Sequence, residues 1–201
     1  MRHALILVDL QPDFMPGGPL AVPDGDAVVE PARQHMLSGD YDIIVATQDW
    51  HPADHKSFAS AHSDGVIGTV VELHGLPQVL WPDHCVQDTA GARIHDGLPA
   101  ERIDRVFKKG VDPEVDSYSG FYDNGRRYST GLTEYLREQQ VSRVTVLGLA
   151  TDYCVKWTAL DAASEGFSVR LDTAACRGVN LNPGDVDKAL AELQQAGVEL
   201  M

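Results

Sequence analysis

The chain has 201 residues, 43% of them hydrophobic, and this length is enough to bury a continuous core without disulfide bonds. Sixteen Lys and Arg against 30 Asp and Glu give a formal net charge of −14, which repels phosphate backbones and anionic membrane surfaces. These values exclude a disordered, collagen-like or coiled-coil chain, and we expect neither nucleic acid nor a membrane as a partner.

The N-terminal segment predicts no export signal. Its apolar run, residues 4–8, is too short for the core of a signal peptide or for a membrane span, so we expect a cytoplasmic protein. The three cysteines, Cys85, Cys154 and Cys176, form no CxxC motif, and an odd number argues against a disulfide framework. Each thiol is therefore expected to be a core residue or a reactive group.

Apolar runs and helical segments alternate along the chain. The runs predict strands at 4–8, 43–46, 105–107, 144–149, 167–171 and 198–200. Helices are predicted at 26–37, 132–139, 151–165 and 185–195. This alternation predicts one α/β domain over residues 1–201, built on an open, mostly parallel six-stranded sheet.

The segment 48–104 breaks the alternation. It contains four prolines and six of the eight histidines but no obvious secondary structure, and Trp50 and Trp81 indicate that it is packed. Long segments of this kind are commonly functional. We predict that it is an insertion that binds metal and substrate.

Chemically active residues follow the predicted strands. The first four strands end at Asp9, at Asp49, at the pair Lys108 and Lys109, and at a segment that contains Cys154. Because ligands of open α/β sheets bind beyond the carboxyl ends of the strands, these residues are the candidates for a catalytic site.

Cys154 is the candidate nucleophile. It lies in the first turn of a predicted helix capped by Thr151 or Asp152, where backbone N–H groups and the helix dipole favour a thiolate. A buried core cysteine is the alternative. Cys176 and Cys85 are interpreted as core residues, with a soft metal ligand as the alternative for Cys85.

An acid and a cation are expected beside the thiol. Burial at the end of a strand can raise the pKa of Asp9 enough for proton exchange with a thiol, although a turn cap is the alternative role. Either Lys108 or Lys109 supplies the cation, because neighbours on a strand face opposite ways and only one can point into the site. The residues alone leave this choice open.

A metal site is predicted in the histidine-rich segment. Asp49 and His51 lie on one side of an extended stretch, and His84 is the candidate third ligand. Two histidines and a carboxylate leave open positions on iron or another divalent ion, whereas ordinary hydrogen bonding in a loop is the alternative. His55 could be a fourth ligand, and the histidines at 62, 74 and 95 look solvated.

The chain resembles the isochorismatase-like cysteine hydrolases and, within them, the bacterial nicotinamidase/pyrazinamidase enzymes. The matching segments are VDLQPDF (8–14), GGPLAVPDGD (17–26), ATQDWHPADHKSFAS (46–60), LWPDHCVQ (80–87), FKKG (107–110), DSYSGFYDNGRR (116–127), GLATDYCVK (148–156) and CRGVN (176–180). The resemblance implies a Rossmann-like, three-layer fold with helices on both faces of the sheet. It also implies hydrolysis of the small molecule nicotinamide to nicotinate and ammonia, with pyrazinamide accepted as an analogue.

The resemblance assigns the catalytic roles. It implies a triad of Asp9, Lys109 and Cys154, and the FKKG match selects the second lysine. It also implies that the backbone N–H groups of Ala150 and Cys154 hold the oxyanion and that the Leu149–Ala150 peptide is cis. The implied aromatic walls of the substrate pocket are Phe14, Trp81, Tyr118 and Tyr153.

One divalent metal ion is implied as cofactor, held by Asp49, His51 and His84. Zinc is the expected metal, with iron and manganese as alternatives, and His55 is left out because its spacing differs from the family pattern. The oligomeric state stays open. Two rival functions are another amidase of this fold, acting on a carbamoyl or ureido substrate without a metal, and a non-enzymatic metal-binding module.

Overall fold

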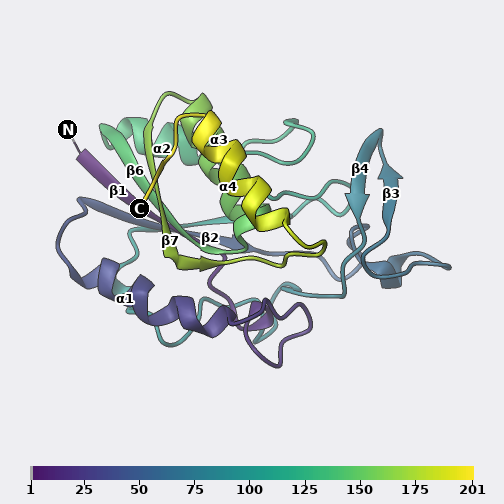
Figure 1. Ribbon diagram of the computed structural model, residues 1–201. Helices are drawn as coiled ribbons and strands as arrows, with labels where there is room; N and C mark the ends of the chain where they lie inside the picture. The colour runs from purple at the N-terminus through teal and green to yellow at the C-terminus, as the bar shows by residue number, and fades with distance from the viewer. Residues whose placement is uncertain (1) are drawn as a thin grey trace.

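The computed structural model describes residues 2–201, and its centre is a six-stranded sheet (Figure 1). The strands are β1 (Arg2–Val8), β2 (Ile43–Asp49), β5 (Arg105–Lys109), β6 (Val141–Leu149), β7 (Ser168–Arg177) and β8 (Glu199–Leu200). They lie in the order β5-β2-β1-β6-β7-β8, and every neighbouring pair is parallel. The predicted α/β fold with a parallel six-stranded sheet is confirmed.

Helices cover both faces of this sheet. Helix α1 (Val29–Leu37) lies on one face, and α2 (Leu132–Glu138), α3 (Lys156–Ser164) and α4 (Asp185–Gln195) lie on the other (Figure 1). Two predicted helices begin differently from a regular α-helix, because a 3₁₀ turn (Gly25–Val28) precedes α1 and a π-helical turn (Thr151–Val155) precedes α3. Among residues 2–201, the helices are too short or too polar to cross a bilayer.

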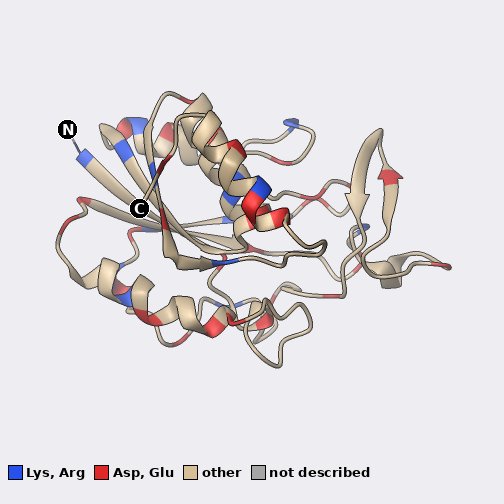
Figure 2. Ribbon diagram, in the orientation of Figure 1, with Lys and Arg blue, Asp and Glu red and all other residues tan. Residues whose placement is uncertain are grey.

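The middle strands form the core. Residues 4–8 of β1 are almost completely buried, because β2 and β6 pair with β1 on either side and helices pack on both faces. This position explains why the run lacks polar alternation. Burying each Leu, Ile or Val side chain contributes about 1.5–3 kcal/mol. Figure 2 shows the charged residues mainly on helices and loops and few along the central strands.

The segment that follows β2 contains regular structure that the sequence did not predict. An antiparallel hairpin, β3 (Val70–Leu73) and β4 (Leu76–Val79), extends from one end of the sheet (Figure 1). Its two-residue turn consists of His74 and Gly75, both with positive φ, as tight hairpins require. The strands escaped prediction because they are short and because Pro77 lies inside the second one.

Candidate active site

Four parallel strands bring their carboxyl ends to one place. Asp9 follows β1, Asp49 ends β2, Lys109 ends β5, and Cys154 lies in the turn after β6. All four side chains are buried, with at most 8% exposed. The structure thus brings together the residues that the sequence analysis selected at the strand ends.

Lys109 is the centre of this cluster. Its Nζ lies 2.9 Å from Oδ2 of Asp9 and 2.5 Å from Oδ1 of Asp49. It also donates to Sγ of Cys154 at 3.3 Å and to the carbonyl oxygen of Ser117 at 2.9 Å. Burial alone would lower the pKa of Lys109, but Asp49 and Asp9 outweigh it and hold that pKa well above its ordinary value. The lysine is therefore a permanent buried cation.

The neighbouring lysine faces the other way. Lys108 is exposed, and its Nζ lies 3.7 Å from the centre of the Trp50 ring in a cation–π contact. The alternation of side chains along β5 therefore places Lys109, and not Lys108, among the strand-end residues.

Asp9 is placed to exchange a proton with the thiol. Thr47 donates from Oγ1 to Oδ1 of Asp9 at 2.6 Å, and an oxygen of Asp9 lies within 4.8 Å of Sγ of Cys154. Burial raises the pKa of Asp9 above its ordinary value, and this effect exceeds the opposing effect of Lys109. The expected increase in the Asp9 pKa is confirmed.

The surroundings of Cys154 favour the neutral thiol over the thiolate. Burial raises its pKa well above the ordinary value although Lys109 opposes the shift, and the charges of Asp9 and Asp49 raise it further. The sequence analysis expected the helix start to favour a thiolate, but desolvation and these two carboxylates shift the pKa in the opposite direction. The sulfur must therefore lose its proton as it attacks.

The expected caps of the turn that carries Cys154 were also wrong. Neither Thr151 nor Asp152 caps it. The Asp152 carboxylate instead accepts from the backbone N–H groups of Val179 and Asn180, at 2.9 and 2.7 Å. Asp152 thus fixes the segment after β7, whose Val179 lines the cavity beside Cys154.

The other two cysteines belong to the hydrophobic core. Cys85 and Cys176 are both buried within it, and burial raises the pKa of Cys176 to about 12. Within residues 2–201, Cys85 joins no group of side chains that could hold a metal ion. Both thiols are core residues, as predicted.

Asp49, His51 and His84 form a site that fits a divalent metal ion. One donor atom from each lies within 4.8 Å of the others, and the two Nε2 atoms are 3.6 and 3.7 Å from Oδ2 of Asp49. Nδ1 of His51 donates to the carbonyl of Gly110 at 2.9 Å, and Nδ1 of His84 donates to that of Pro82 at 2.7 Å. Since a carbonyl only accepts, both Nε2 atoms keep a lone pair, which is the usual arrangement of metal-binding histidines.

Gly110 is required at this site. Its φ is +63°, and the position that a Cβ would occupy falls on the ring of His51. A larger residue would displace the histidine. This close approach accounts for the glycine that follows the lysine pair.

His55 lies next to the three candidate ligands. Its ring centre is 4.4 Å from that of His51, and burial lowers its pKa to about 4, so the ring is neutral. Asp116 lies on the same side, with an oxygen within 4.8 Å of ring nitrogens of His51 and His55. Asp116 was not predicted as a site residue, although it lies in the matching segment that begins DSYSG.

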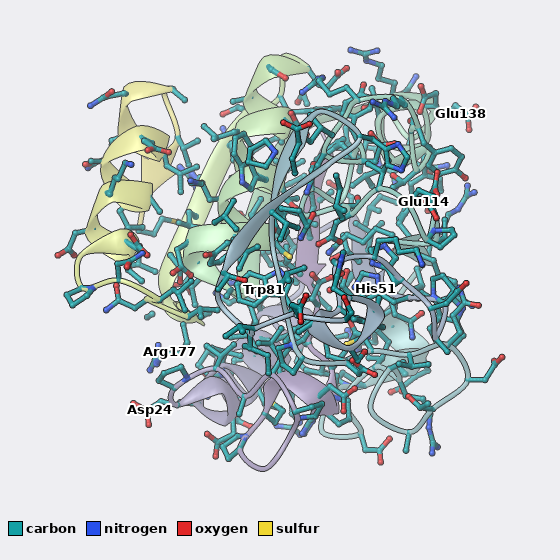
Figure 3. The ribbon with its side chains drawn as sticks, turned by 90° about the vertical axis from the view of Figure 1, so that its right-hand side faces the viewer. Asp24, His51, Trp81, Glu114, Glu138 and Arg177 are labelled. Carbon is teal, nitrogen blue, oxygen red and sulfur yellow. The ribbon has the colours of Figure 1, made fainter. Side chains whose placement is uncertain are left out.

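A cavity connects the thiol to the candidate metal site. It has about 400 Å³ of empty space including its open mouth, a size typical of small-molecule sites. Figure 3 views the end of the molecule at which Trp81 and His51 lie. The lining residues are Phe14, Leu20, Val22, Asp49, Trp81, His84, Asp116, Tyr118, Ala150, Tyr153, Cys154 and Val179.

All four aromatic residues expected at the substrate line this cavity. Tyr153 packs edge-on against Trp81 and Tyr118, with ring centres 5.0 and 5.4 Å apart. Nε1 of Trp81 donates to the hydroxyl of Tyr118 at 3.3 Å. The rings form a rigid apolar wall suited to a flat heterocycle.

The two residues whose N–H groups are expected to hold the oxyanion lie at the cavity. Ala150 and Cys154 both line it, and the Leu149–Ala150 peptide is cis, as the resemblance implied. The carbonyl of Ala150 accepts from the N–H groups of Tyr153 and Val155, on either side of Cys154.

Gln11 supports the site and was missed by the sequence analysis. Its Nε2 donates to the carbonyl of Asp49 at 2.9 Å, and its Oε1 accepts from the N–H of Asp49 at 2.8 Å. These two bonds pair the Gln11 side chain with the backbone of β2 beyond Val8, where β1 has ended and no longer supplies backbone partners. Its place in the matching segment VDLQPDF was the available signal.

The chain is similar in sequence to a known domain family and to known proteins. The isochorismatase domain family matches residues 3–201. A nicotinamidase of Escherichia coli is 50% identical over 200 residues, which cover 98% of this chain and 93% of the relative.

Two solved structures are also similar. A nicotinamidase/pyrazinamidase of Acinetobacter baumanii matches with a TM-score of 0.95 and 41% identity, over 100% of this chain and 95% of that one. A pyrazinamidase of Pyrococcus horikoshii in complex with zinc matches with a TM-score of 0.80 and 37% identity, over 100% and 99%.

Proposed function

This chain belongs to the isochorismatase family, and we propose that it hydrolyses nicotinamide to nicotinate and ammonia and also accepts pyrazinamide. One structural observation supports the proposal independently of the similarity to named relatives. A single cavity has the Cys154 thiol on one side and the Asp49 and His84 side chains on another, with aromatic walls around it. This arrangement suits an aromatic ring that carries both a carboxamide and a ring nitrogen.

The first half of the reaction forms a thioester. Asp9 accepts the thiol proton as Sγ of Cys154 attacks the carboxamide carbon. The N–H groups of Ala150 and Cys154 hold the oxyanion, a contribution of about 3 kcal/mol per donor. Asp9 then gives the proton to the amide nitrogen, the C–N bond breaks, and ammonia leaves.

The second half releases the acid. Asp9, again a carboxylate, takes a proton from water as the water oxygen attacks the thioester carbon. The C–S bond breaks, nicotinate leaves, and the sulfur recovers the proton from Asp9. Throughout, the Lys109 ammonium offsets the negative charge that moves between Asp9 and Cys154.

Asp49, His51 and His84 would hold the metal ion, and zinc is the metal we propose. The zinc complex of the similar pyrazinamidase and the two Nε2 lone pairs support this assignment. When bound, the ion supplies a Lewis acid for the ring nitrogen of the substrate. Trp81 and Tyr118 keep the ring in the cavity while its carboxamide reaches Cys154.

A comparison of substrates tests the proposed function. We expect the purified protein to release ammonia from nicotinamide and pyrazinamide and to leave an N-carbamoyl amino acid unchanged. Release from the N-carbamoyl compound alone would favour the rival amidase. Release from none of the three would favour a non-enzymatic metal-binding module.

A further inference from the structure

His55 is a buried histidine to which the reaction above gives no role. It is completely buried, and its Nε2 has no hydrogen-bond partner within the described part of the chain. A buried polar atom without a partner is costly, so its persistence requires an explanation.

The hydrogen bonds of His55 determine which nitrogen carries the proton. The backbone N–H of Ser57 donates to Nδ1 at 3.1 Å, and Oγ of Ser57 lies 2.7 Å from the same atom. Because a backbone N–H can only donate, Nδ1 must carry a lone pair, and the proton of the neutral ring is then on Nε2. The unpartnered atom is therefore a donor.

This protonation distinguishes His55 from the two histidines beside it. His51 and His84 each donate from Nδ1 to a carbonyl and keep a lone pair on Nε2. His55 has the opposite arrangement, and an Nε2 that carries hydrogen cannot coordinate a metal ion. The Nε2–H group of His55 is instead suited to donate a hydrogen bond to a water molecule bound to the ion.

Asp116 supplies an acceptor at the same place. Its carboxylate is buried and accepts from the N–H of Ser117 at 2.7 Å and from Nε2 of Gln78 at 3.1 Å. Asp116 takes part in none of the ion pairs found among residues 2–201. A buried carboxylate without a cationic partner favours a nearby positive ion.

We propose that His55 and Asp116 form a donor–acceptor pair that holds the hydration shell of the divalent ion bound by Asp49, His51 and His84. One ring nitrogen of His51, one of His55 and an oxygen of Asp116 lie within 4.8 Å of one another, so both residues reach the neighbourhood of the ion. His55 is thus a positioning residue and not a ligand. The inference rests on the metal site of the proposed function and adds two residues to it.

The expected effect is on metal affinity. Residues that hydrogen-bond to groups around a metal ion commonly change its affinity by 10–100-fold when they are replaced. We expect His55→Ala to weaken Zn²⁺ binding by about this factor. His55→Gln should largely restore binding, because its side-chain amide offers an N–H donor at a similar reach.

The experiment compares Zn²⁺ affinity in metal-stripped protein by competition with a coloured chelator. The variants are His55→Ala and His55→Gln, with His62→Ala as the matched control, because His62 lies in the same segment and its Nε2 bonds only the carbonyl of Lys56. The absorption spectrum of the Co²⁺ form provides a second measurement, since it reports the number and type of ligands. We expect the same Co²⁺ spectrum in wild type and in both His55 variants.

Several results would overturn the inference. If His55→Gln binds Zn²⁺ as weakly as His55→Ala and both alter the Co²⁺ spectrum, His55 is a ligand. If His55→Ala binds as tightly as wild type, His55 has no role in metal binding. Wild-type protein that binds neither ion would contradict the metal site of the proposed function as well, whereas wild-type binding with unaffected variants contradicts this inference alone.

Asp116→Asn is an independent test in case His55→Ala does not fold. It keeps the shape of the side chain and removes the charge, and we expect Zn²⁺ affinity to fall by about 10-fold or more. Unchanged affinity would contradict the role of Asp116. Circular dichroism of each variant checks that the fold is intact.

Discussion

Asp49 and Lys109 are directly opposite each other in the pairing of β2 with β5, and their side chains form an ion pair of 2.5 Å. The other carboxylate oxygen of Asp49 faces His51 and His84. Asp49 therefore belongs both to the cluster around Lys109 and to the candidate metal site. Burial alone would raise its pKa, but Lys109 and His51 hold it well below the ordinary value, so Asp49 is ionised.

The first prediction concerns the two lysines. Lys109→Ala should raise the pKa of the Cys154 thiol further and reduce kcat/KM for nicotinamide by about two orders of magnitude or more, because the cation beside the sulfur is lost. Lys108→Ala is the matched control and should stay near wild type, since its side chain lies on Trp50. The pH dependence of iodoacetamide labelling measures the thiol. A shift in the Lys108 variant and none in the Lys109 variant would reverse the roles.

The second prediction concerns the three thiols. In the folded protein, iodoacetamide should modify Cys154, which lines the cavity, and leave Cys85 and Cys176 unmodified in the core. Peptide mass analysis after labelling measures this. Cys85→Ala and Cys176→Ala should retain activity and lower the free energy of unfolding by about 1 kcal/mol. Faster labelling of either core cysteine would contradict the assignment.

The third prediction concerns the acidic limb of the activity profile. Asp9 must be ionised in the free enzyme to accept the thiol proton, and burial raises its pKa above the ordinary 3.8. Because the folded-state pKa is raised, kcat/KM should fall as the pH decreases through that raised value. The measurement is kcat/KM for nicotinamide against pH. A rate that stays constant down to pH about 4 would argue against Asp9 as the base.

The proximity of the residues at the strand ends could be predicted, because a parallel sheet brings the carboxyl ends of its strands to one edge regardless of the loop conformations. This rule predicts that Asp9, Asp49, one lysine of the pair Lys108 and Lys109, and Cys154 lie close together, and the resemblance to the family selects Lys109. The direction in which the pKa of Cys154 shifts could not be predicted in the same way. It depends on desolvation and on charges that only the folded chain brings within a few ångströms.

The position of Asp116 beside His55 could not be predicted either. Asp116 is 61 positions from His55 in the sequence, and no periodic pattern relates the two. Their proximity depends on how two irregular segments pack beside each other, and such packing leaves no local signal in the sequence. The hairpin β3–β4 was missed for a related reason, because its strands have only four residues each and lack a clear apolar alternation.

The fourth prediction concerns metal removal. Benzamide has the same carboxamide on a ring without the nitrogen, so the metal-loaded enzyme should prefer nicotinamide in kcat/KM by more than about tenfold. Chelation or His84→Ala should reduce this preference, because both remove the group that recognises the nitrogen. Equal preference in all three forms would mean that the aromatic walls alone recognise the ring.

The most direct test of the account is nicotinate formation by wild type and by Cys154→Ala, followed by chromatography, with Cys176→Ala as the matched control. We predict that wild type and Cys176→Ala convert nicotinamide to equal amounts of nicotinate and ammonia. We also predict that Cys154→Ala forms neither while keeping its fold and its Zn²⁺ affinity. Turnover by the Cys154→Ala variant at the wild-type rate would contradict the account.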